Sequence, residues 1–378
     1  MRKSEIIHWL REKRAARLEE LYRLADETRR RNVGDEVHLR GLIEVSNCCV
    51  RDCAYCGLRA GHRALARYRM NAEEILGCVR KAADYGYGTV VLQSGEDYGI
   101  ATEPMAEIIR RIKSETDLAV TLSFGERPDE DLARWRAAGA DRYLLRFETS
   151  DAKLYERIHP PLNGGPSDRI AILRRLGTLG YEVGSGVMIG IPGQTYESLA
   201  EDIELFRTLD LDMIGVGPYL PHPNTPLGRR PGDFRAPESD QAPNTEEMTH
   251  KVLALTRLAC PRANIPSTTA LATLNAAGGR EIGLRRGANV VMPNLTPLKY
   301  RALYEIYPGK ACIAETAEAC QAFLRQRILS IGRKVGTGPG GALIHHDGAK
   351  FHHDDTTDTT NAAQRTSKRR ITVTAVPS

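Results

Sequence analysis

Three cysteines at short spacing are the residues of this sequence best suited to hold a metal centre. Cys49, Cys53 and Cys56 form a C-x3-C-x2-C pattern within one segment. Soft thiolate ligands select iron–sulfur clusters or zinc. Three thiolates are one ligand short of a closed tetrahedral set, so a cluster held by them keeps one iron open to an exogenous ligand. The pattern therefore predicts a metal centre with one open position.

A zinc ion is the alternative occupant of the same segment. His62 extends the pattern to C-x3-C-x2-C-x5-H and could supply a fourth ligand, which would make the protein a barrel with a structural zinc site. Cys48 is not expected to be a ligand, because adjacent residues seldom direct their side chains to one metal ion. The cysteine chemistry by itself leaves the cluster and the zinc ion both open.

The charge balance and the lengths of the apolar runs argue against a nucleic-acid-binding protein and a membrane protein. The chain has 378 residues, with 53 basic and 48 acidic residues and a formal net charge of +5, an excess too small to indicate nucleic acid as a ligand. No apolar run approaches the roughly 18 residues of a membrane span, and the basic N-terminal segment lacks the apolar core of a signal peptide. We therefore expect a cytoplasmic protein that binds no membrane, in which clustered cysteines indicate a metal rather than disulfides.

Short apolar runs that alternate with helical patterns predict the scaffold that positions the cysteines. Helical patterns cover residues 72–85, 103–114, 129–138 and 198–209. The expected strands are residues 37–46, 89–95, 119–125, 142–149, 182–190, 213–220, 268–274 and 289–294. Eight strands that alternate with helices predict an α/β fold, a parallel (βα)8 TIM barrel whose active site lies in the loops after the strands.

The sequence divides into three regions. Residues 1–36 read as an N-terminal helical extension, because apolar residues recur at helical spacing up to about Arg31. Residues 37–335 form the barrel with a C-terminal helix. Residues 336–378 are Gly/Pro-rich and polar, with little to bury, and we expect them to form a disordered tail.

The cysteine pattern, with Tyr55 before its last cysteine and at the end of the first strand, resembles the signature of radical S-adenosylmethionine (SAM) enzymes. The resemblance implies that the three cysteines hold a 4Fe-4S cluster whose open iron binds SAM. One-electron reduction would then split SAM to a 5′-deoxyadenosyl radical. The resemblance assigns catalytic roles to the three cysteines and Arg146. It assigns SAM contacts to Tyr55, Ser94, Gly95, Glu96, Glu148 and Arg169.

Further stretches resemble the HydE family of [FeFe]-hydrogenase maturases, among them residues 40–47, 91–97, 217–223, 287–294 and 303–310. The resemblance implies an enzyme of H-cluster assembly that acts on a cysteine-bound iron carbonyl cyanide precursor. Such a substrate is a small organometallic or amino-acid-like molecule. The implied partners are a one-electron donor and the HydG and HydF maturases. The implied substrate contacts are Thr121, Arg146, Thr268, Thr269, Met292, Tyr304 and Tyr307.

Two positions depart from the HydE pattern. Cys312 and Cys320 match places where some members carry a second, surface cluster, but Phe323 replaces the third cysteine. Two thiolates without that partner predict that no second cluster forms. Phe147 replaces an expected histidine beside the SAM contacts, and we expect it to alter the hydrogen bonding there.

Methylornithine synthase and biotin synthase share this architecture and are the related alternatives. Biotin synthase needs a second cluster inside the barrel as a sulfur donor, and the expected strands after the first contain no cysteine. Methylornithine synthase uses only the SAM cluster. The resemblance over residues 289–294 and 303–310 favours the HydE family.

Overall fold

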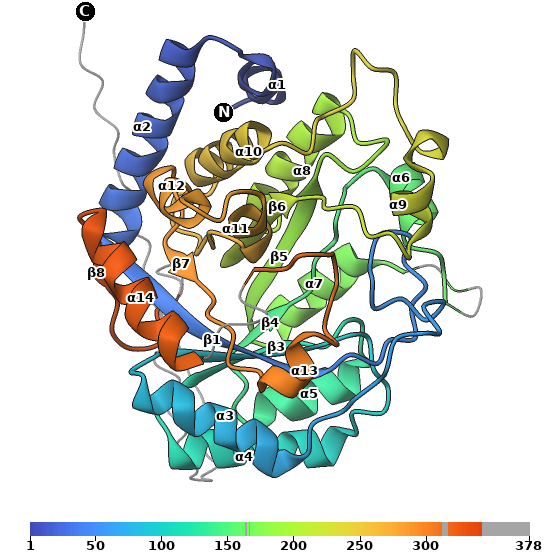
Figure 1. Ribbon diagram of the computed structural model, residues 1–378, viewed down its shortest axis with the longest axis vertical. Helices are drawn as coiled ribbons and strands as arrows, with labels where there is room; N and C mark the ends of the chain where they lie inside the picture. The colour runs from blue at the N-terminus through green and yellow to red at the C-terminus, as the bar shows by residue number, and fades with distance from the viewer. Residues whose placement is uncertain (163–164, 166, 312–316, 342–378) are drawn as a thin grey trace, which may run out of the picture. The chain divides into compact units, whose positions relative to one another are not determined.

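A curled sheet of parallel strands lies at the centre of the protein, with helices outside it (Figure 1). The structure is a computed structural model that describes residues 1–162, 165, 167–311 and 317–341. The strands follow the order β6-β5-β4-β3-β2-β1-β7, and β8 pairs with the beginning of β1. Their bounds are β1 Glu36–Ser46, β2 Thr89–Ser94, β3 Ala119–Ser123, β4 Arg142–Leu144, β5 Glu182–Ile189, β6 Met213–Pro218, β7 Val290–Val291 and β8 Lys334–Val335.

Single parallel bridges complete the ring between β6 and β7. Asn264 pairs with Met213 on β6, and Pro266 pairs with Val290 on β7. The segment 264–266 therefore occupies the seventh place around the ring, and β7 occupies the eighth. The predicted α/β barrel is confirmed.

The prediction of a seventh strand at residues 268–274 is wrong. Its residues form helix α11 (Thr269–Leu274), and the side chain of Thr268 caps it by accepting a hydrogen bond from the Leu271 amide at 3.3 Å. A mixture of threonines and apolar residues is compatible with either structure over so short a run, and the N-cap favours the helix.

The helices outside the barrel begin with capping side chains where the sequence provides them. At α3, Asn71 accepts from the Glu74 amide and Glu74 accepts from the Asn71 amide, at 2.9 and 3.0 Å. None of the described helices is long and apolar enough to cross a membrane. The helices up to β6 are α1 Lys3–Arg11, α2 Ala15–Val33, α3 Ala72–Asp84, α4 Thr102–Glu115, α5 Asp129–Ala137, α6 Ala152–Ile158, α7 Arg169–Thr178 and α8 Tyr196–Thr208. Those after β6 are α9 Pro226–Arg229, α10 Glu246–Ala259, α11, α12 Gly279–Arg285, α13 Leu298–Arg301 and α14 Ala317–Ser330, with a 3-10 turn at Pro231–Asp233.

The N-terminal extension consists of two helices rather than the single one expected. The Glu12 carboxylate lies in the break between α1 and α2 and accepts from the amides of Lys13 and Arg14, both at 2.9 Å. These bonds satisfy backbone donors that a continuous helix would have used internally, so the chain turns there.

Residues 336–341, which were predicted to belong to the disordered tail, lie against the barrel end opposite the predicted active site. The Pro339 carbonyl accepts from Arg142 Nη2 at 3.1 Å, and the Gly340 carbonyl accepts from Arg40 Nη2 at 3.0 Å. Both arginines are buried. The remainder of the predicted tail lies outside the described residues.

Candidate functional site

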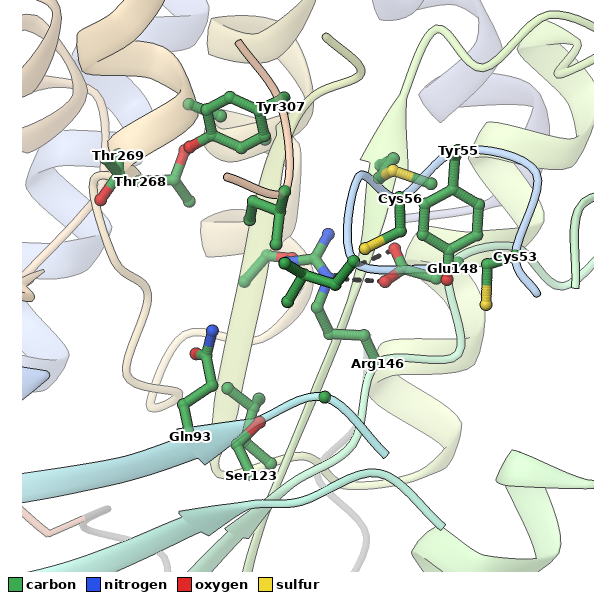
Figure 2. A pocket seen from close by; sticks show the side chains of 18 of the residues that line it. Cys53, Tyr55, Cys56, Gln93, Ser123, Arg146, Glu148, Thr268, Thr269 and Tyr307 are labelled. Carbon is green, nitrogen blue, oxygen red and sulfur yellow. Dashed lines mark hydrogen bonds and ion pairs between the residues drawn. The ribbon is translucent and has the colours of Figure 1, made fainter. Parts of the chain in front are cut away.

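A cavity of about 360 Å³ lies at the carboxyl ends of the strands, where a barrel places its active site. Figure 2 shows Cys53, Tyr55 and Cys56 on one side of it and Thr268, Thr269 and Tyr307 on the other, with Arg146 and Glu148 between them. We call the first side the cysteine end, which comprises Cys49, Cys53, Tyr55 and Cys56. We call the second side the hydroxyl end, which comprises Thr268, Thr269, Tyr304 and Tyr307.

The loop after β1 that carries the cysteines is fixed by backbone hydrogen bonds to three distant segments. The amide of Val50 donates to the Glu96 carbonyl at 2.9 Å, and the amide of Ala54 donates to the Ile158 carbonyl at 2.7 Å. A third bond joins the Gly57 amide to Ile306 at 3.0 Å. The loop is therefore held in place by the barrel around it.

Gly95 allows the cysteine loop to approach the end of β2. A side chain at this position would collide with the Cys48 carbonyl oxygen and approach the Cys49 Cβ to 2.8 Å. The adjacent Glu96 amide donates to the Cys49 sulfur at 3.4 Å. The predicted residues Ser94, Gly95 and Glu96 thus line the cavity beside the cysteines.

The protonation of the three thiols depends on what occupies the cysteine end. Burial raises the pKa of the Cys49 and Cys53 thiols above their usual range and raises that of Cys56 to about 12. Thiolates at these positions therefore need a strong positive partner, which a metal centre supplies. Three soft sulfur ligands on one buried loop, with an amide directed at one sulfur, fit an iron–sulfur cluster.

His62 has other partners than the cysteines. Its Nδ1 lies 2.8 Å from the Gly57 carbonyl oxygen and its Nε2 lies 3.2 Å from Asn224 Nδ2. Both ring nitrogens are thus engaged, which argues against His62 as the fourth ligand of a zinc ion. Over the described ranges, no three Cys, His, Asp or Glu side chains converge on one point as a single ion requires. A cluster binds its cysteines through separate irons and does not require such convergence.

A buried network of arginines and carboxylates forms the wall beside the cysteine end. Arg51 donates to Glu96 Oε1 at 2.6 Å and to Glu126 Oε2 at 2.7 Å, and Arg169 donates to Glu126 Oε1 at 2.9 Å. The predicted residues Glu96 and Arg169 therefore line the cavity while engaged in ion pairs. Arg51 and Glu126 were not predicted, although Arg51 lies inside the cysteine pattern itself.

Arg146 and Glu148 face each other across the middle of the cavity (Figure 2). The Arg146 Nε donates to both Glu148 carboxylate oxygens at 3.0 and 3.2 Å, and its Nη1 donates to the Gly215 carbonyl at 3.0 Å. Glu148 has a φ of 65°, a left-handed conformation that costs a non-glycine residue about 1 kcal/mol or more. Such strained residues cluster at functional sites, and in this conformation the Glu148 carboxylate points at the Arg146 guanidinium.

The fourth strand is shorter than predicted, since β4 ends at Leu144 rather than at residue 149. Phe147 in the segment that follows is buried and packs on Phe206 of α8, with ring centroids 5.6 Å apart. Phe147 does not line the cavity. It therefore cannot provide or remove a hydrogen bond to a ligand there, contrary to our expectation.

The predicted substrate residues divide into those that reach the cavity and one that does not. Thr121 lies deeper in β3, where its Oγ1 is buried without a hydrogen-bond partner, and Ser123 lines the cavity instead. Gly217 on β6 makes room for a lining hydroxyl, because a Cβ there would lie 2.8 Å from Thr268 Oγ1. The residues that reach the cavity are Arg146, Thr268, Thr269, Met292, Tyr304 and Tyr307.

An ion pair between Glu44 and Lys310 lines the hydroxyl end and was not predicted. Glu44 is fully buried on β1, and its Oε2 accepts from Asn294 at 3.1 Å and from Thr296 at 3.3 Å. The Lys310 ammonium donates to Glu44 Oε1 and lies 5.1 Å from the ring centroid of Tyr304. A carboxylate inside the apolar run of β1 was the available signal.

The two cysteines that match the positions of a second cluster in some relatives cannot be placed from the structure. Cys312 and the side chain of Cys320 lie outside the described residues. The expectation that no second cluster forms stays a prediction.

Comparison with known proteins places the chain among others of this architecture. The Radical SAM superfamily model matches residues 43–206. The [FeFe] hydrogenase maturase subunit HydE of Thermotoga maritima is 47% identical over 324 residues, which cover 85% of this chain and 88% of that protein. The 3-methylornithine synthase of Methanosarcina acetivorans is 29% identical, with 76% and 79% covered. The crystal structure of a methylornithine synthase matches with a TM-score of 0.73 at 25% identity, over 89% of this chain and 94% of the other.

Proposed function

The chain belongs to the HydE family of [FeFe]-hydrogenase maturases within the radical SAM superfamily, and we propose how its cavity serves that activity. A 4Fe-4S cluster would occupy the cysteine end, SAM the middle of the cavity beside it, and a small organometallic or amino-acid-like substrate the hydroxyl end. The observation that carries the proposal is the single cavity that joins the three thiols of the cysteine loop to Arg146, Glu148 and the hydroxyl end. When bound and reduced by one electron, the cluster and SAM supply a 5′-deoxyadenosyl radical.

Cys49, Cys53 and Cys56 hold the cluster in this proposal. The Glu96 amide that donates to the Cys49 sulfur stabilises its thiolate form. Cys53 is buried and Cys49 and Cys56 are only partly exposed, and this limited access of water to the reacting atoms protects a radical from side reactions. The protein's own contribution at this end is thus ligation, orientation and exclusion of water.

The middle of the cavity binds SAM. Glu148 uses its two oxygens on one guanidinium nitrogen, so it keeps lone pairs for the SAM ammonium or ribose hydroxyls. Ser94 and Tyr55 add hydroxyl groups at the same end. The Arg169 Nε donates to Glu126, and this bond holds the guanidinium in place. Arg169 therefore acts on the SAM carboxylate as a fixed positive charge.

Arg146 orients the substrate. Its Nε and Nη1 bind Glu148 and Gly215, while its Nη2 has no protein partner in the described structure. A guanidinium with unused donors suits an anionic or cyanide-bearing ligand. The hydroxyl groups of Thr268 and Thr269 lie opposite and add polar groups to a lining that is otherwise mostly apolar. The family further supports the HydG and HydF maturases as partners, one of them delivering the substrate, together with a separate one-electron donor and a cytoplasmic location.

The test compares Arg146→Lys and Arg146→Met with the unmodified protein after anaerobic cluster reconstitution. Both variants should retain the brown colour of the cluster, and SAM cleavage without substrate should change little. Hydrogenase maturation in a strain that lacks the native protein should fall at least tenfold with Arg146→Met. Unimpaired maturation with Arg146→Met, or a colourless wild-type protein holding one zinc ion, would overturn the proposal.

A further inference from the structure

The surface over the cysteine loop carries positive charge that the chemistry of the cavity does not use. Residues 51–69 contain five arginines and one acidic residue, and residues 222–235 contain three arginines and one acidic residue. The formal net charge of the whole chain is only +5. Arg51 is buried in the cavity wall, and without it the two segments still carry a net charge of +5, as much as the complete chain.

The two segments lie side by side and form one surface. The Leu227 amide donates to the carbonyl of Ala54 in the cysteine loop at 3.0 Å. The ring centroids of His62 and His222 lie 5.8 Å apart, and Leu227 and Ala54 share a small apolar cluster. We call residues 51–69 and 222–235 together the arginine surface.

Several arginines of this surface have no acidic partner. Arg59 pairs with Asp52 at 2.6 Å and Arg69 pairs with Asp97 at 2.7 Å, while Arg51 points inward to the buried network. The exposed arginines that make no ion pair in the described structure are Arg63, Arg67, Arg229 and Arg235. A cluster of unneutralised guanidinium groups raises the local potential and attracts an acidic partner.

The arginine surface includes the outer side of the cysteine loop. Arg59 Nε donates to the carbonyl of Cys53 at 3.2 Å, and Asp52 next to that cysteine has 49% of its side chain exposed. Cys53 itself is buried. A protein docked here would therefore contact the loop that holds the ligands without entering the cavity.

We propose that the arginine surface docks an acidic one-electron carrier protein. The inference rests on the proposed function, because only a cluster at the cysteine end needs an electron from outside. In the transfer the reduced carrier loses one electron and the cluster gains it, and no bond forms or breaks. Opposite charges on the two partners orient the encounter and accelerate it.

Direct binding tests this docking without reference to catalysis. Fluorescently labelled, oxidised flavodoxin, an acidic electron carrier, is titrated with the full chain at low ionic strength. The surface variant is Arg63→Glu with Arg235→Glu, because neither exposed side chain makes a hydrogen bond or ion pair in the described structure. The control is Arg30→Glu with Arg31→Glu on α2, which changes the net charge equally at exposed positions outside the arginine surface.

The surface variant should raise the flavodoxin Kd roughly tenfold and the control less than twofold, with wild-type binding weakened by added salt. Equal weakening in both variants, or in neither, would overturn the docking proposal. A second readout is SAM cleavage: the surface variant should be slower with limiting reduced flavodoxin and unchanged with dithionite. Absence of cleavage with dithionite in every protein would instead refute the proposed function and leave the binding result standing.

Discussion

Replacing Lys310 by Met should destabilise the protein by about 3–5 kcal/mol, the usual cost of removing one partner of a buried ion pair. The cost is large because Glu44 is fully buried and keeps only the neutral donors of Asn294 and Thr296 once the ammonium is gone. Glu44→Gln should cost less, about 2–3 kcal/mol, because the ammonium keeps the ring of Tyr304 beneath it.

The double variant Glu44→Gln with Lys310→Met should cost far less than the two single changes together, because it leaves no uncompensated charge. Urea unfolding of the metal-free protein, followed by circular dichroism under anaerobic conditions, gives the four stabilities of this cycle. Costs that simply add, with a coupling below about 1 kcal/mol, would refute the reasoning that the two groups form one buried pair. Lys310→Arg serves as the control that keeps the charge.

Three further predictions concern the site. Cys53→Ala should abolish SAM cleavage by the reconstituted protein, whereas Cys260→Ala, outside the cavity, should not; equal rates would contradict the assigned ligands. Burial and then Arg169 lower the pKa of His159 to about 2, so its contribution to stability is complete above about pH 6.5 and is lost as pH falls below that value. Between about pH 7.5 and about pH 5, the free energy of unfolding of His159→Gln should therefore fall by about 2 kcal/mol less than that of the wild type. Urea titrations at the two pH values measure this difference, and equal falls would contradict the prediction. Thr121→Val should leave SAM cleavage unchanged and raise the unfolding free energy by about 1 kcal/mol, because it removes a buried hydroxyl without a partner; lost activity would place Thr121 in the site.

The cysteine loop and the barrel could be predicted because their signals are local. The C-x3-C-x2-C spacing identifies the three cluster ligands directly. The alternation of strands and helices predicts a parallel barrel, in which the carboxyl ends of the strands meet on one side. Residues at those ends, such as Ser94 and Arg146, then fall at the cavity without any knowledge of contacts.

Depth along a strand and pairing across the chain could not be predicted in this way. Thr121 and Ser123 share one face of β3, and only the position of the cavity floor decides which of them is a lining residue. Glu44 and Lys310 are separated by 266 positions, so no local pattern links them. The left-handed turn at Glu148 likewise depends on its pairing with Val187 of a neighbouring strand rather than on its own sequence.

Residues 336–341 show the clearest reason for such a failure. Compositional signals of disorder count apolar side chains, and this stretch has few. It is held instead by its backbone, whose carbonyls accept hydrogen bonds from Arg40 and Arg142 inside the base of the barrel. Burial lowers the pKa of Arg40 to about 9, because its guanidinium is poorly solvated there. Two buried arginines that face the barrel interior require hydrogen-bond acceptors. The sequence feature that indicates an ordered segment is therefore the pair of arginines on the strands and not the composition of residues 336–341.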